Sequence, residues 1–303
     1  MIYKPRLEPE ELTFLNALKP RMTLSEIDRQ QYYRLRKGYE GEMLFDQLTD
    51  KLQSECYIMN GLLLKVNNST FQIDTLIIIS GTIYLYEVKN YDGDYLYDTE
   101  TDRIYKLPQT EYNNPLHQMN RTKSLLRQLL HTIGHKFPIE SHVVFINPQF
   151  TLYQAPLNKH FIFPTQVTSH LRNLDAAMSS HNGTDRLLAD KLVSLHIEKS
   201  PYTRLPSYKY EHLKTGVNCK FCHSFSIDVN GLSCICSNCG FKESVETAIV
   251  RTIKQIKLLN PNWKITTNEA IKWCGLINCR KRVSRILRKN FKIAGKYRGT
   301  YYE

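Results

Sequence analysis

The chain has 303 residues and a formal charge of +12, which allows one large domain with accessories or two or three small domains. The charge is uneven, because residues 251–303 hold 14 Lys and Arg against two acids and the remainder is neutral overall. A basic block of this kind is typical of proteins that bind a polyanion, most often nucleic acid, with an anionic membrane surface as the alternative. No apolar run approaches the length of a transmembrane helix and no signal peptide is evident, so we expect a cytoplasmic protein without membrane segments.

The first part of the chain is expected to be helical. The pattern of residues 8–36 predicts highly charged helices that are interrupted near Pro20. The spacing of apolar residues in 38–53 predicts a further helix with one apolar face. Glu42 lies at the margin of that face, where it can reach a metal ion held by a following sheet. A solvated helix glutamate is the alternative.

Residues 72–90 predict two strands joined by a tight Ser-Gly turn. Counting back from a two-residue turn places Asp74 opposite Glu87. Like charges whose side-chain roots lie about 5 Å apart destabilise a sheet unless a cation lies between them. Because strand side chains alternate, Lys89 projects from the same face as Glu87.

This combination of two carboxylates and an ammonium suits phosphodiester hydrolysis, in which Mg²⁺ is held by one or two carboxylates together with phosphate oxygens. A lysine there orients or deprotonates the attacking water, or stabilises charge on the phosphate. A solvated Glu-x-Lys pair is the common alternative. Asp74, however, lies in an otherwise apolar strand, where an unpaired carboxylate is costly, and this favours a catalytic metal site.

The flanking elements complete a mixed α/β pattern. Strands are expected at 57–66, near Tyr95 and at 103–107, and a buried strand at 142–147. A helix is expected from Asn114, a good cap, to Gly134. The order of one helix, three antiparallel strands, a helix and a strand excludes a repeat array or an all-β sandwich.

With these residues in place, the chain resembles the nuclease-related domain family, called NERD, of the PD-(D/E)XK nuclease superfamily. The matching pieces, in the family's order, are Gly38-x-x-Gly41-Glu42, Gln72-Ile73-Asp74, Glu87-Val88-Lys89-Asn90 followed by Tyr91 and Gly93, and Asn114-Pro115-x-x-Gln118. They cover about residues 38–150. The resemblance implies an α/β fold with a restriction-endonuclease-like mixed sheet flanked by helices.

The resemblance also implies roles for individual residues. Asp74 and Glu87 match ligands of Mg²⁺ or Mn²⁺, and Lys89 matches the catalytic lysine. Glu42 matches a supporting acid, and Gln118 a further position of the family's site. The alternative for Gln118 is a residue near a helix start that packs against the sheet.

Farther along, two cysteine pairs separated by 13 residues have the spacing of a zinc ribbon: Cys219, Cys222, Cys236 and Cys239. Four thiolates close a tetrahedral shell, so the pattern predicts structural Zn²⁺ in a reducing compartment. Cys234 and His223 lie near enough to compete as ligands, with a spare thiol and a surface imidazole as the alternatives.

The C-terminal residues resemble a winged helix-turn-helix domain. A helix is expected at 244–259, followed by a short helix, a turn and a second helix that carries Arg280, Lys281, Arg282, Arg285, Arg288 and Lys289. We expect this basic helix to enter a DNA major groove, beside a wing that carries Tyr297, Tyr301 and Tyr302. An amphipathic helix that is simply solvated outside is the alternative. Cys274 and Cys279 are expected to pack between the two helices.

These elements divide the chain into five expected regions. They are an N-terminal helical extension at 1–37, a NERD nuclease-like domain at 38–198, a linker at 199–214, a zinc ribbon at 215–242 and a winged-helix-like DNA-binding domain at 243–303. Together they predict a Mg²⁺-dependent nuclease that the basic C-terminal domain delivers to DNA. The alternatives are a non-enzymatic DNA-binding regulator on a nuclease-like scaffold and a protein that binds or cuts RNA.

Overall fold

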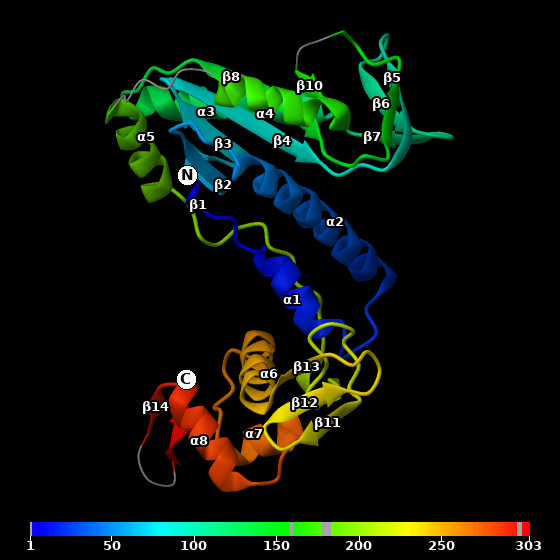
Figure 1. Cartoon of the computed structure of the whole chain (residues 1–303), viewed down its shortest axis with the longest axis vertical. Helices are drawn as coiled ribbons and strands as arrows, with labels where there is room; N and C mark the ends of the chain where they lie inside the picture. Colours follow the sequence, from blue (N-terminus) through cyan, green and yellow to red (C-terminus); the bar gives the residue numbers. More distant parts are fainter. Residues whose placement is uncertain (1, 158–159, 177–182, 296–298) are drawn as a thin grey trace. The chain divides into compact units, whose positions relative to one another are not determined.

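A computed structural model describes residues 2–157, 160–176, 183–295 and 299–303, which belong to two compact units (Figure 1). The first unit comprises Met1–Pro9 and Tyr33–Tyr202, and the second comprises Glu10–Tyr32 and Thr203–Glu303. The N-terminal segment that we expected as an extension is therefore divided between the units. No helix of the described residues is long and apolar enough to cross a membrane.

A six-stranded mixed sheet forms the centre of the first unit, in the order β1-β2-β3-β4-β8-β10. The strands are β1 (Ile2–Lys4), β2 (Tyr57–Val66), β3 (Ser69–Ile79), β4 (Thr82–Lys89), β8 (Ile139–Phe145) and β10 (Phe161–Ile162). The central three pair antiparallel, whereas β1, β8 and β10 run parallel to their neighbours. This sheet confirms the α/β class with a mixed sheet that the sequence predicted.

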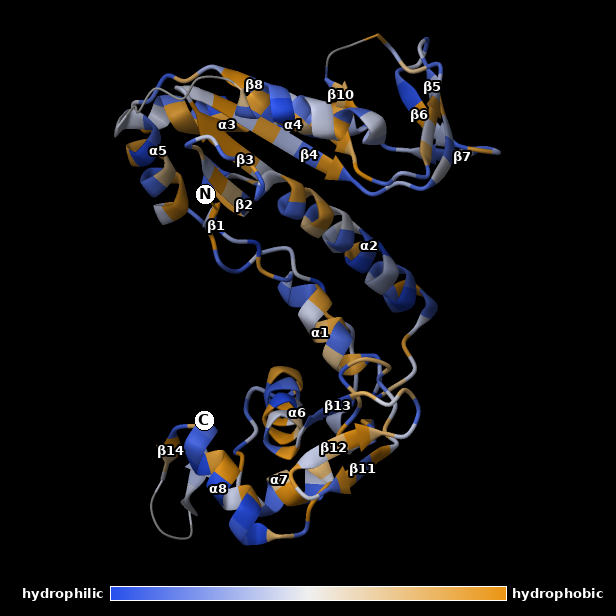
Figure 2. Cartoon of the chain, in the orientation of Figure 1, coloured by the Kyte–Doolittle hydropathy of each residue, from blue (hydrophilic) through white to orange (hydrophobic). Residues whose placement is uncertain are grey.

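Helices cover both faces of this sheet. They are α2 (Glu26–Thr49), α3 (Pro115–Thr132), α4 (Val167–Asp175, after the short turn Pro164–Gln166) and α5 (Gly183–Ser194). One apolar cluster joins Phe45 of α2 and Leu171 of α4 to the strands, and another joins Leu126 of α3 and Leu188 of α5. Figure 2 shows the apolar residues along the central strands that these clusters bury.

A smaller sheet adjoins the end of β4 in the order β7-β6-β5-β9. Its strands are β5 (Gly93–Asp98), β6 (Arg103–Lys106), β7 (Thr110–Tyr112) and β9 (Phe150–Tyr153). Aromatic rings join the two sheets. The ring centroid of Phe150 lies 4.0 Å from that of Phe145 and 5.3 Å from that of Tyr95.

Helix α2 is longer than we expected. It begins at Glu26, after α1 (Glu10–Leu18), and runs without a break through Gly38 to Thr49. An interior glycine costs a helix only about 1 kcal/mol relative to alanine, and burial of residues such as Phe45 offsets that cost. The expected start at residue 38 was therefore wrong.

Besides α1 and the first residues of α2, the described residues of the second unit form a small sheet, three helices and a two-stranded antiparallel sheet. These are β11 (Ile227–Asn230), β12 (Ser233–Cys236), β13 (Lys242–Ser244), α6 (Val245–Leu259), α7 (Thr267–Cys274), α8 (Arg280–Asn290), β14 (Ile293–Ala294) and β15 (Tyr301–Tyr302), with a short turn at Tyr210–His212. Residues 296–298, which include Tyr297 of the expected wing, lie outside the described residues.

The cysteine-rich segment and the helices of the second unit share one core. Val217 and Cys234 pack in a cluster with Ile249 of α6 and Ile286 of α8. A neighbouring cluster joins Leu18 of α1 and Leu213 to α6 and α7. The segments expected as an N-terminal extension, a linker, a ribbon and a helical domain thus pack together.

The two cysteines of the α7–α8 region differ in their surroundings. Cys274 is buried in the shared core as expected. Cys279, however, is exposed at the residue before α8 and is not part of that core, so the expectation that it packs between the two helices was wrong.

Candidate functional site

The hairpin of β3 and β4 has the register that the sequence predicted. Both residues of its turn have positive φ, 49° and 75°, which matches the twist of the flanking strands. The ladder pairs the two strands as far as Thr75 and Tyr86, and one further step along it places Asp74 opposite Glu87.

Four of the predicted residues meet near the end of β4. The ammonium of Lys89 donates to Oε1 of Glu87 at 2.7 Å and to Oε1 of Gln118 at 3.1 Å. Oδ2 of Asp74 accepts the backbone N–H of Val88 at 2.9 Å. Helix α3 thus delivers Gln118 to the sheet face that carries Lys89, and Gln118 contacts the lysine directly.

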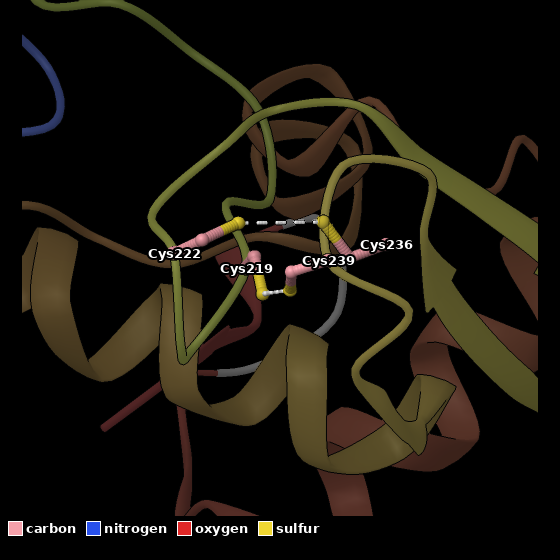
Figure 3. Close-up of side chains that lie close together, drawn as sticks. All are labelled: Cys219, Cys222, Cys236 and Cys239. Atoms are coloured by element: carbon pink, nitrogen blue, oxygen red, sulfur yellow. Dashed lines mark hydrogen bonds between the residues drawn. The ribbon is translucent and has the colours of Figure 1, made fainter.

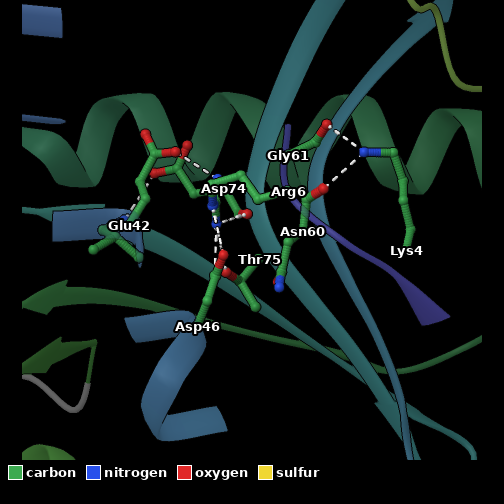
Figure 4. Close-up of polar contacts among 9 residues, drawn as sticks. Lys4, Arg6, Glu42, Asp46, Asn60, Gly61, Asp74 and Thr75 are labelled. Atoms are coloured by element: carbon green, nitrogen blue, oxygen red, sulfur yellow. Dashed lines mark hydrogen bonds and ion pairs between the residues drawn. The ribbon is translucent and has the colours of Figure 1, made fainter. Parts of the chain in front are cut away.

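Glu42 is held by a residue that the sequence did not indicate. Arg6 follows β1, and its NH1 donates to Oε2 of Glu42 at 2.5 Å (Figure 4). Its Nε and NH2 donate to the two carboxylate oxygens of Asp46 at 2.7 and 2.9 Å, and NH2 also donates to the carbonyl of Asp74 at 2.7 Å. The side chain of Arg6 is only 3 % exposed. In the sequence, only the four-residue spacing of Glu42 and Asp46, which puts both acids on one helix face, indicated that a basic side chain would lie there.

A close approach of α2 to the end of β4 brings Glu42 to the sheet. A Cβ atom at Gly41 would lie 2.4 Å from Cβ of Asn90, so only glycine fits there without a shift. Asn90 donates its side-chain amide to the carbonyl of Lys37 at 2.8 Å and accepts from the Asn147 amide at 3.0 Å. The second glycine of the Gly-x-x-Gly-Glu motif therefore has a packing role.

Burial and mutual repulsion shape the electrostatics of the acids. Burial, with the charge of Asp74 added, raises the pKa of both Glu42 and Glu87 to about 8. Burial also raises the pKa of Asp74, against the effects of Lys89 and the Val88 N–H. Burial acts to lower the pKa of Lys89, but the charges of Glu87 and Asp74 outweigh it and raise that pKa above its usual value. The lysine is therefore protonated at neutral pH.

The carboxylates near the end of β4 fit a hard divalent cation that takes only some of its ligands from the protein. Among the described residues, only the cysteine group brings three or more potential ligand atoms within 4.8 Å of one another, so the three acids do not form a closed cage. Mg²⁺ is commonly bound by one or two carboxylates, with water and phosphate oxygens completing the shell. Asp74 and Glu87 provide such a pair. Burial raises the pKa of both, and the charge of Asp74 adds to the effect on Glu87, so a bound cation would favour their charged forms.

The four predicted cysteines converge in the second unit (Figure 3). Sγ of Cys219 lies 3.6 Å from Sγ of Cys239, and Sγ of Cys222 lies 3.5 Å from Sγ of Cys236. A zinc tetrahedron with 2.3 Å bonds to sulfur has edges of about 3.8 Å, so the group can hold this ion. Cys234 packs in the shared core instead.

Arg251 of α6 connects the residue before the first cysteine pair to β13 through hydrogen bonds. Its NH2 donates to the carbonyl of Asn218 and to Oε1 of Glu243, both at 2.6 Å. Asn218 immediately precedes Cys219, and Glu243 lies on β13. The cysteine group is therefore connected to α6 as well as to its own hairpin.

The six basic residues of α8 fall into two sets. Arg282, Arg285 and Lys289 line a hollow together with residues of the β11–β12 turn, β13 and α6, whereas Arg280, Lys281 and Arg288 do not. Lys289 pairs with Glu246 of α6 at 2.9 Å. The helix is thus basic on more than one side, and only one side faces the hollow.

Residues 37–146 match a family model, NERD, described as the nuclease-related domain. The match includes Glu42, Asp74, Glu87, Lys89 and Gln118, and it confirms the resemblance that the four motifs indicated. No curated protein and no solved structure matches the chain.

Proposed function

We propose that this protein is a metal-dependent nuclease that hydrolyses phosphodiester bonds of DNA. The observation that carries the proposal is the contact of Lys89 with Glu87 and Gln118 beside Asp74, within the residues that match the nuclease-related domain. Paired carboxylates and a charged lysine on one sheet face are the groups that this reaction requires.

Asp74 and Glu87 would hold Mg²⁺ or Mn²⁺, which supplies positive charge to a phosphodiester that gains negative charge in the transition state. Because its raised pKa keeps Lys89 protonated, the lysine acts as a hydrogen-bond donor that orients the attacking water and stabilises the phosphate oxygens. Gln118 and Glu87 fix the position of its ammonium. Glu42 is the supporting acid, and Arg6 holds it against the sheet.

The second unit would deliver the enzyme to DNA. The cysteine group would hold structural Zn²⁺, and the basic residues of α8 would contact phosphates with an affinity that falls as salt rises. Four thiols retained for metal binding require a reducing compartment, which supports a cytoplasmic location.

The test is cleavage of plasmid and linear DNA with Mg²⁺, Mn²⁺ or EDTA. We expect metal-dependent cutting that falls at least about a hundredfold in Lys89→Ala and Asp74→Asn. Lys65→Ala, which removes an exposed lysine from β2, is the matched control and should cut normally. Equal cutting by the Lys89→Ala variant, or cutting in EDTA, would contradict the proposal.

One observation favours a second candidate, a non-enzymatic DNA-binding regulator. The three acids do not gather within 4.8 Å of one another, as they would in a preformed closed metal site. A regulator would bind DNA but cut neither DNA nor a matched RNA strand under any metal condition. Cutting of the RNA strand alone would instead identify an RNA-directed nuclease.

A further inference from the structure

A hollow of about 400 Å³ lies beside α8 in the second unit. Three elements meet there: the turn between β11 and β12, the start of α6 and one side of α8. The lining residues are Leu232, Ser244, Glu246, Arg282, Arg285, Ile286 and Lys289. The hollow thus has a floor from Ile286, on the apolar side of α8, and a rim that is mainly basic.

Hydrogen bonds fix the walls of this hollow. NH2 of Arg282 donates to the carbonyl of Gly231 in the β11–β12 turn at 2.9 Å. The N–H of Val245, the first residue of α6, donates to the carbonyl of Leu232 at 2.9 Å. The tip of the cysteine-rich hairpin is therefore tied both to α8 and to α6.

The charge inside the hollow is positive. Glu246 is its only acid, and Lys289 and the Asn290 amide already contact that carboxylate at 2.9 and 3.0 Å. Arg285 is exposed and adds a full charge, and the start of the 15-residue helix α6 adds partial positive charge. An anion entering the hollow would meet Arg285 and Lys289 on one side and the start of α6 on the other.

We propose that this hollow binds a phosphate group of the DNA backbone, with Arg285 and Lys289 as its direct contacts. The inference rests on the proposed delivery of the enzyme to DNA and names the surface that performs it. Arg282 shapes the wall through Gly231. The hairpin tip forms the opposite wall, and its hydrogen bonds to α6 and α8 hold that wall in place.

The experiment measures the affinity of the full chain for a short DNA duplex by fluorescence anisotropy over a series of salt concentrations. The Lys89→Ala background prevents cutting. Arg285→Ala should weaken binding about tenfold, and Arg285→Ala and Lys289→Ala should each reduce the salt slope by about one. Lys254→Ala removes the same charge from an exposed position of α6 outside the hollow, and should weaken binding about twofold at most. Equal losses of DNA affinity in the three variants would contradict the proposed site and would indicate general electrostatic attraction instead.

Two further variants separate a lost contact from a misfolded protein. Glu246→Gln removes the only acid of the hollow and should tighten binding, which misfolding does not do. Leu232→Glu adds a negative charge on the hairpin wall and should weaken binding without removing a base. Unchanged affinity in both, or tighter binding of RNA of the same sequence than of DNA, would overturn the proposal. Because cleavage by the unmodified protein is measured separately, these outcomes do not depend on whether it is a nuclease.

Discussion

The guanidinium of Arg6 contacts the carboxylate of Glu42 at 2.5 Å, although 36 positions separate the two residues in the chain. The same guanidinium pairs with Asp46 and donates to the backbone of β3 at Asp74. The segment before α1 therefore belongs to the candidate active site. A buried arginine with these acceptors pairs with two acids and connects α2 to the strand that carries a predicted metal ligand.

We expect Arg6→Ala to destabilise the first unit by about 3–5 kcal/mol, because it leaves two largely buried carboxylates without their partner. Urea denaturation followed by circular dichroism measures the change. The control is Arg29→Ala, which removes an arginine paired with Glu26 where both side chains are 58 % exposed. It should have little effect. An equal free energy of unfolding in Arg6→Ala and Arg29→Ala would show that the Arg6 contacts contribute nothing to stability.

The two glycines of the Gly-x-x-Gly-Glu motif should respond oppositely to alanine. Gly41→Ala places a methyl group against Asn90 and should cost about 1–3 kcal/mol. Gly38→Ala meets nothing within 4 Å in the middle of α2 and should stabilise by about 1 kcal/mol. Thermal denaturation of the two variants is the measurement. Stabilisation by both substitutions would mean that α2 does not pass this close to the end of β4.

The pKa values of Glu42 and Glu87, raised from 4.5 to about 8, predict how stability depends on pH. A carboxyl group with a raised pKa binds its proton more tightly in the folded state. The contribution of this bound proton to the stability of the folded protein is complete below about pH 4.5 and is lost as the pH rises through 8. We therefore expect the metal-free protein to lose stability between these pH values.

Mg²⁺ or Mn²⁺ should oppose this loss. Because the metal binds deprotonated carboxylates, the rise in melting temperature that it causes should grow as the pH increases toward 8. Differential scanning fluorimetry with and without the metal measures this effect, and Asp74→Asn should reduce it. A metal effect that is independent of pH would contradict the assignment of these acids as its site.

Removal of the metal from the cysteine group should disturb the helices of the second unit. The N–H of Gly216, just before the first cysteine pair, donates to the carbonyl of Trp273 in α7 at 2.8 Å. The only tryptophans of the chain, Trp263 and Trp273, both lie in the second unit. We expect a zinc chelator to change tryptophan emission together with the release of one zinc ion per chain.

Two cysteine variants test that prediction. Cys236→Ser should lose zinc and show the same altered emission, whereas Cys234→Ala should retain zinc because that thiol packs in the core outside the metal group. Zinc release with unchanged emission would mean that the ribbon folds independently of the helices.

Local patterns in the sequence account for much of the fold and of the candidate site. The Ser-Gly turn fixes the register of β3 and β4, and hence the relation of Asp74 to Glu87, because side chains alternate with a period of two. The helix after Asn114 begins where the sequence indicated, with the Asn114 side chain accepting the N–H of Leu116. Cysteine spacing likewise predicted that these four thiols would lie close together.

Other features depend on contacts that no local pattern encodes. The start of α2 was misplaced because helix propensity is weak, and packing against the sheet carries the helix through Gly38. The hollow beside α8 exists only because the β11–β12 turn packs against two helices. The sequence shows six basic residues on α8 but not which of them face the hollow.

The sequence by itself determined the hairpin register, the grouping of the four cysteines and the basic character of α8, since each follows from the spacing of nearby residues. Only the tertiary structure placed Arg6 against Glu42, brought Gln118 to Lys89 and joined the ribbon to the helices in one core. The physical reason is that these contacts join residues far apart in the chain. Their positions are set by how the apolar faces of whole elements pack, which is a property of the assembled fold.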